Sequence, residues 1–68
     1  MRQVIVYRDE DGNWCASCPS LPGCHSQGDT RDEAIDNIKE AIALYIEALE
    51  ADGLPVPEET REVVTVDV

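Results

Sequence analysis

Two periodicities divide the chain into a region of short strands and one long helix. Residues 3–8 form a run rich in β-branched side chains, which is typical of a strand. Residues 13–18 alternate, so that Trp14, Ala16 and Cys18 share one face and the residues between them share the other. This alternation predicts a second strand with one buried face.

Turn residues separate the predicted strands. Residues 9–12 end in Gly12, which can supply the positive φ of a tight turn, so the first two strands should form a hairpin. Residues 19–23 contain two prolines, which cannot donate hydrogen bonds to a ladder and therefore interrupt it. A short third strand is predicted at residues 24–27, and residues 28–29 turn the chain toward a helix.

The helix start carries the sharpest local signal. Thr30 and Glu33 fit the capping box S/T-x-x-E, in which each side chain bonds the backbone N–H of the other residue. The helix is predicted to run to about Asp52, because Gly53 offers a C-terminal cap and Pro55 forbids continuation. Steps of three and four residues define its apolar stripe: Ala34, Ile38, Ala41, Ile42, Tyr45, Ile46 and Leu49.

A last strand completes the predicted fold. Residues 54–57 form a stiff linker with two prolines, and residues 62–66 are again rich in valine and threonine. The predicted class is therefore α+β with the order β-β-β-α-β. An antiparallel three-stranded meander is followed by one helix packed on the sheet, and a right-handed crossover makes the fourth strand parallel to strand one. The other sheet face is left for a second subunit or a partner.

The length of the chain limits how much core it can build. Sixty-eight residues make one domain, residues 1–68, and such a chain buries only about 60% of its unfolded surface. Phe is absent, and one Trp and two Tyr supply all the aromatic bulk. Because small cores usually need support, we expect a homo-oligomer, either a dimer or a tetramer.

The charge of the chain restricts the class of partner. Fifteen acidic residues against five basic ones give a net charge of −10, and the basic residues are scattered. Nucleic acids and anionic membranes require clustered Lys and Arg, so both are disfavoured. An acidic surface suits a basic protein partner, and the same charge also serves solubility alone. With no leader and no apolar run of about 18 residues, we expect a cytoplasmic protein.

Three cysteines and a histidine raise the question of a metal site. Cys15, Cys18, Cys24 and His25 follow the pattern C-x2-C-x5-C-H, which offers the four ligands that zinc needs. Cys15 and Cys18 lie three residues apart on a predicted strand, so their side chains point to opposite faces. We therefore expect thiols in a reducing compartment, with no metal and no cofactor.

Several motifs together resemble the HicB antitoxin family. They cover nearly the whole chain with the family's spacing, and they are Asp11-Gly12-x-Trp14-x-Ala16, Pro19-x-Leu21-Pro22-Gly23-Cys24, Gly28-Asp29-Thr30, Glu33-Ala34 and Gly53-Leu54-Pro55-Val56-Pro57. The resemblance implies a partial, degenerate RNase H-like fold with the β-β-β-α-β order. Longer members append a DNA-binding domain after this core, and we expect none here because the chain ends at Val68.

The resemblance also implies a function and a partner. HicB-like antitoxins neutralise a small basic HicA-like toxin, which has a double-stranded-RNA-binding-like fold and cleaves mRNA with a histidine. The acidic chain would occlude the toxin's RNA-binding face and its catalytic histidine. The expected contact residues come from the proline-rich loop and from the exposed helix face, and they are Pro19, Leu21, Pro22, Asp36, Glu40 and Glu47. The alternatives left open are a solvated helix face and an orphan oligomeric protein-binding domain without a toxin.

Catalysis by this chain is not expected. A metal-dependent nuclease needs several carboxylates converging on one ion, and in the RNase H-like fold the first lies in the middle of strand one. Here the middle of that strand is residues 4–6, all apolar, and the acids at residues 9–11 lie in a turn. Cys24 and His25 are neighbours in sequence, which does not make them a hydrogen-bonded pair. We therefore predict no enzymatic activity.

Overall fold

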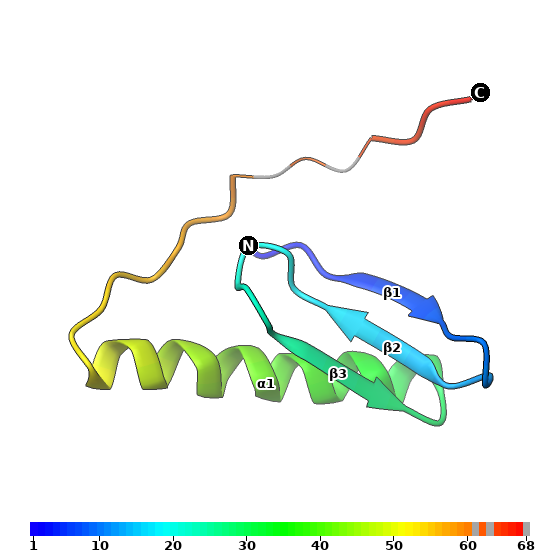
Figure 1. The fold of residues 1–68 in the computed structure, drawn as a ribbon, viewed down its shortest axis with the longest axis horizontal. Helices are drawn as coiled ribbons and strands as arrows, with labels where there is room; N and C mark the ends of the chain where they lie inside the picture. The colour runs from blue at the N-terminus through cyan, green and yellow to red at the C-terminus, as the bar shows by residue number, and fades with distance from the viewer. Residues whose placement is uncertain (61, 63, 68) are drawn as a thin grey trace.

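A computed structural model describes residues 1–60, 62 and 64–67. Three strands are followed by one helix (Figure 1): β1 (Ile5–Arg8), β2 (Trp14–Ser17), β3 (His25–Gly28) and α1 (Arg31–Ala51). Within this part of the chain the sheet order is β1-β2-β3, and both pairs are antiparallel. The predicted three-stranded meander followed by a helix is confirmed.

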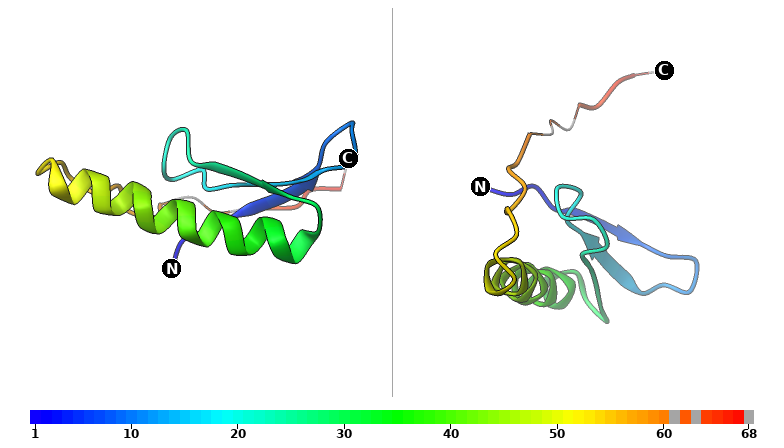
Figure 2. Two further views of the ribbon diagram at one scale, coloured as in Figure 1. Left: turned by 90° about the horizontal axis from the view of Figure 1, so that it is seen from below. Right: turned by 60° about the vertical axis from the view of Figure 1, so that its left-hand side comes forward.

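The strand register decides which side chains face the helix. Val6 pairs with Ala16, and both pack in the core that the helix covers. Ile5 and Tyr7, one position out of phase, are 43% and 47% exposed. Figure 2 shows α1 on one side of the sheet only. The predicted one-sided packing is therefore observed, with an uncovered face that contains apolar side chains.

The buried core is small and draws on the loop as well as on the strands. Of the helix residues, only Ala34 and Ile38 are buried. The loop contributes Leu21, whose side chain is completely buried. The cluster of buried residues consists of Ala16, Cys18, Leu21, Cys24, Ala34 and Ile38. A core of this size, without any Phe, gives the fold little reserve of stability.

The helix is much longer than the strands that it covers. Each strand has four residues, or about 13 Å at the usual rise, whereas the 21 residues of α1 extend about 31 Å. In Figure 1 the C-terminal turns of α1 extend past the ends of the strands. The apolar stripe beyond Ile38 is accordingly only half-buried at Ala41, Ile42, Tyr45 and Ile46.

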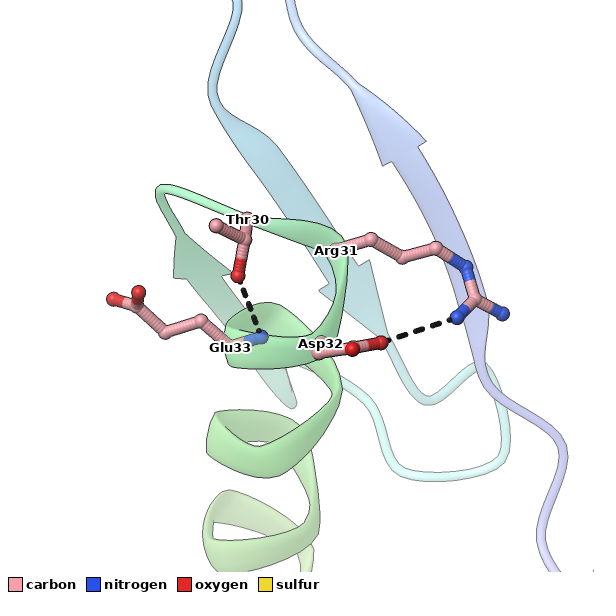
Figure 3. Close-up of polar contacts among 4 residues, drawn as sticks. All are labelled: Thr30, Arg31, Asp32 and Glu33. Atoms are coloured by element: carbon pink, nitrogen blue, oxygen red, sulfur yellow. Dashed lines mark hydrogen bonds and ion pairs between the residues drawn. The ribbon is translucent and has the colours of Figure 1, made fainter.

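Thr30 caps the helix as predicted, but the box is only half formed. Its Oγ1 accepts a hydrogen bond from the backbone N–H of Glu33 at 3.1 Å. Figure 3 shows the Glu33 carboxylate directed away from Thr30, so the predicted reciprocal bond is not made. Arg31 and Asp32 form an exposed ion pair at 3.4 Å, and such a pair contributes little to stability.

The N-terminal cap gives a first measurable expectation. Thr30→Ala removes the Oγ1 acceptor and leaves the Glu33 N–H to water, which should lower the free energy of unfolding by about 1 kcal/mol. Glu33→Gln is the matched control, because the Glu33 side chain makes no bond to the cap, and it should change stability by only a few tenths of a kcal/mol. Urea unfolding followed by circular dichroism measures both. Equal effects of the two variants would contradict the capping role.

Over the described residues, the chain returns from the helix to the start of β1 without adding a strand. Gly53 has a φ of 69°, and the segment beyond it is held by hydrogen bonds from Arg2 to the Pro57 carbonyl and from the Gln3 N–H to the Glu59 carboxylate. Among the residues predicted as the fourth strand, the described positions 62 and 64–66 have no strand pairing, and position 63 lies outside the described residues. A fourth parallel strand and an RNase H-like arrangement stay predictions.

Candidate functional site

The proline-rich loop is a compact turn built around a buried leucine. Three backbone hydrogen bonds of 3.0 Å hold the loop together. The N–H of Cys18 donates to the Cys24 carbonyl at the mouth of the loop, the N–H of Leu21 donates to the Cys18 carbonyl, and the N–H of Cys24 donates to the Leu21 carbonyl. Leu21 fills the core beneath these bonds. Its side chain is fully buried in this conformation and belongs to the core, and its role as a contact residue stays a prediction.

Side-chain hydrogen bonds fix the loop at two further points. The Tyr45 hydroxyl donates to the Pro22 carbonyl at 2.8 Å, which ties the outer part of the loop to α1. The Arg2 guanidinium donates to the buried Ser20 hydroxyl at 2.9 Å from the other side. Pro22 is exposed and Pro19 is half-buried, so the loop presents a rigid apolar rim to solvent. Such a rim could bind a partner at little cost in conformational entropy.

The three predicted helix acids form an exposed ridge. Asp36, Glu40 and Glu47 are all exposed, and their spacing of four and seven residues places them along one side of α1. Leu44 lies within the same ridge, four residues after Glu40 and three before Glu47. The ridge is therefore acidic with one large apolar side chain at its centre.

The loop rim and the acidic ridge do not form one patch. Tyr45, which holds Pro22, belongs to the stripe that packs toward the sheet, whereas the ridge occupies the solvent side of the helix. The predicted contact residues therefore divide into two surfaces on different sides of α1. The hydrogen bond between Tyr45 and Pro22 was not predicted from the sequence. A tyrosine in an apolar stripe indicates only that its hydroxyl has some polar partner, and it does not indicate which one.

The overhanging end of the helix adds a feature that was not predicted. A hollow of about 180 Å³ opens beside the last turns of α1, lined by Tyr45, Ala48, Leu49 and Asp52. Tyr45 thus connects the loop rim to this hollow. The sequence signal was the continuation of the apolar stripe to Leu49, well beyond the length that a short sheet can cover.

The cysteines and His25 do not come together as ligands. Cys18 and Cys24 lie in the core cluster, whereas Cys15 lies outside it and donates a weak hydrogen bond to the Asp9 carboxylate at 3.9 Å. Within the described residues, no group of three or more His, Cys, Asp or Glu side chains could hold a metal ion. Burial raises the pKa of the Cys24 thiol, and the neighbouring Cys18 raises it further, so this thiol stays protonated at neutral pH.

One acid of the first hairpin, Asp9, has a structural role. The Asp9 carboxylate accepts hydrogen bonds from the backbone N–H groups of Asn13 and Asp11, at 2.9 and 3.0 Å. The bond from Asn13 is the main reason that the pKa of Asp9 is lowered, because it favours the charged form. Gly12 completes this turn with a φ of 85°. The Asp9 carboxylate is therefore explained by the geometry of the turn.

The fold and the surface define a small α+β protein with three surface features: a loop rim tied to α1, an acidic ridge and a hollow at the end of the helix. A family model described as HicB-like antitoxin of bacterial toxin-antitoxin systems matches residues 3–67. The chain belongs to this family. Among the described residues, no helix combines the length and apolar character that crossing a bilayer requires.

Relatives with similar sequences occur in bacteria and archaea. A UPF0150 protein of Synechocystis sp. is 59% identical over 56 residues, covering 82% of this chain and 71% of the relative. A UPF0150 protein of Thermoplasma acidophilum is 48% identical over 63 residues, covering 93% of this chain and 91% of the relative. The similarity extends beyond the shared turn motifs, since it spans most of both chains.

Two solved structures share the fold. One chain of a HicA3 and HicB3 toxin-antitoxin complex superposes with a TM-score of 0.74 at 29% identity, covering 91% of this chain and 72% of that one. The N-terminal domain of the Burkholderia pseudomallei antitoxin HicB superposes with a TM-score of 0.68 at 32% identity, covering 93% of this chain and 69% of that one. The predicted resemblance to HicB is thereby confirmed.

Proposed function

We propose that this chain is an antitoxin that neutralises a small basic HicA-like toxin by covering its RNA-binding face and its catalytic histidine. The observation that carries the proposal is the match to a chain of a HicA3 and HicB3 toxin-antitoxin complex, which extends over 91% of this chain. The net charge of −10 supports a basic partner, because complementary potentials speed encounter and disfavour wrong partners. Inhibition by occlusion requires no chemistry of this chain.

The contact surface in this proposal consists of the loop rim and the acidic ridge. Pro19 and Pro22 offer a rigid apolar rim, and Asp36, Glu40 and Glu47 offer the charges. Because the two surfaces lie on different sides of α1, a toxin that touches both must contact more than one side of the helix. A cytoplasmic location follows for such a protein, since mRNA is the toxin's substrate.

Charge reversal on the ridge tests the proposal. The proposal predicts a small basic HicA-like protein encoded beside this gene. The double variant Glu40→Lys, Glu47→Lys should bind that protein at least about tenfold more weakly, because it replaces attraction by repulsion. Its stability should stay close to that of the parent, since both side chains are exposed. Biolayer interferometry with a catalytically inactive toxin measures binding, and rescue of growth arrest measures neutralisation.

A matched charge reversal separates the ridge from overall charge. Glu10→Lys with Asp11→Lys changes the net charge by the same amount in the first hairpin, far from α1 along the chain, and both residues are exposed. This control should retain most of the affinity. Equal losses in both double variants would mean that only net charge matters. A parent chain that binds no such toxin would instead favour the orphan oligomeric domain, for which the uncovered face with Ile5 and Tyr7 is the surface available.

A further inference from the structure

The hollow at the end of α1 has the form of a receptor for one long side chain. It is lined by Tyr45, Ala48, Leu49 and Asp52, and its lining is mostly apolar with one acidic residue. The walls are fixed before any partner arrives. Tyr45 is held by the Pro22 carbonyl at 2.8 Å, and the Leu54 N–H closes the helix end on the Leu49 carbonyl at 2.9 Å.

The electrostatics of this hollow select a cation. The last turn of α1 carries no basic residue, so the negative end of the helix dipole is not neutralised there. Glu47, Glu50 and Asp52 add three carboxylates to the same end. In the described part of the chain, the Asp52 carboxylate makes no hydrogen bond or ion pair, because the C-terminal cap uses its backbone N–H. A mostly apolar cleft with an acidic residue in its lining suits an amphipathic cationic side chain.

We propose that this hollow receives an arginine side chain of the basic partner. The aliphatic stem lies between Ala48 and Leu49 with the guanidinium beside the Tyr45 ring, where stacking is favourable, and its N–H groups bond the Asp52 carboxylate. A second copy of this chain is a poor occupant, since each copy carries a net charge of −10. The inference rests on the proposed antitoxin function and identifies the part of the chain that anchors the toxin.

Two single variants test the anchor against the inactive toxin. Asp52→Asn removes the charge and keeps the size of the side chain, and it should weaken binding about tenfold. Ala48→Leu fills the hollow at an exposed helix position, where both residues favour a helix, and it should weaken binding to a similar extent. Glu50→Gln is the control, because it removes a charge from the same turn outside the hollow, and it should change affinity less than about threefold.

The outcomes separate this inference from the antitoxin function itself. If the parent binds the toxin and both variants bind it equally well, the hollow is not the anchor and the antitoxin role stands. If the parent binds no toxin, the antitoxin role fails, and N-acetyl-arginine amide then tests the hollow directly by NMR with N-acetyl-glutamine amide as the neutral control. Amide shifts at Ala48, Leu49 and Asp52 that disappear in Asp52→Asn support the hollow as a cation receptor. Identical spectra with both compounds overturn it.

Discussion

Replacement of Ile38 by Asp should leave the chain unfolded at room temperature. Ile38 is 1% exposed and lies at the centre of the core cluster between α1 and the sheet. The substitution removes a large apolar side chain and buries a carboxylate without a partner, a loss of about 4 kcal/mol or more. A 68-residue domain with so small a core has stability near or below the lower end of the usual range of about 5–15 kcal/mol. Far-UV circular dichroism during a thermal melt measures the result.

The matched control lies on the same helix. Leu44→Asp introduces the same charged side chain at a position that is already 59% exposed, so the free energy of unfolding should change by less than about 1 kcal/mol. This variant also places a fourth carboxylate in the acidic ridge without disturbing the core. A cooperative melt of Ile38→Asp near the temperature of the parent would show that the buried face of α1 has been misassigned.

Local physical chemistry explains why the elements could be predicted from the sequence. Alternation in residues 13–18 and the β-branched run at residues 3–8 predict strands that the structure confirms, with ends shifted by one or two residues. The Thr30 cap and Gly53 bracket the helix to within one residue of its observed ends, because both act through neighbouring backbone groups. Each of these signals depends on contacts within a few residues along the chain.

The parts that could not be predicted depend on contacts between distant segments. Leu21 was predicted as a contact residue of the proline-rich loop, and the loop folds back so that its side chain lies in the core. The bond from Tyr45 to Pro22 joins residues 23 positions apart. The overhang of α1 depends on the length of the helix relative to the strands, and the hollow lies beside the last turns of this overhanging helix. Sequence periodicity predicts the apolar stripe of the helix, but it does not indicate at which residue the sheet ceases to cover that stripe.

Gly28 is the position where the addition of a single methyl group should have the largest effect. It ends β3 opposite Trp14, and the helix begins three residues later, directly against it. A Cβ atom at Gly28 would lie 2.6 Å from the backbone nitrogen of Ala34 and 2.9 Å from the carbonyl carbon of Glu33. Backbone atoms cannot move aside as a flexible side chain can, so Gly28→Ala forces the first turn of α1 away from the sheet.

The expected cost follows from what this displacement disturbs. Ala34 is fully buried in the core, so a shift of the first helical turn loosens the packing that supports the whole domain. Gly28→Ala should lower stability by about 3 kcal/mol, which corresponds to a fall in Tm of roughly 10–20 °C for a domain of this size. Gly23→Ala is the matched control: its φ of 79° is unfavourable for alanine, but no atom lies within 4 Å of the added Cβ, so a loss of only about 1 kcal/mol is expected. If Gly23→Ala proves the more damaging of the two in thermal melts, backbone conformation outweighs the close approach of α1 to β3, and the position of the helix on the sheet is set elsewhere.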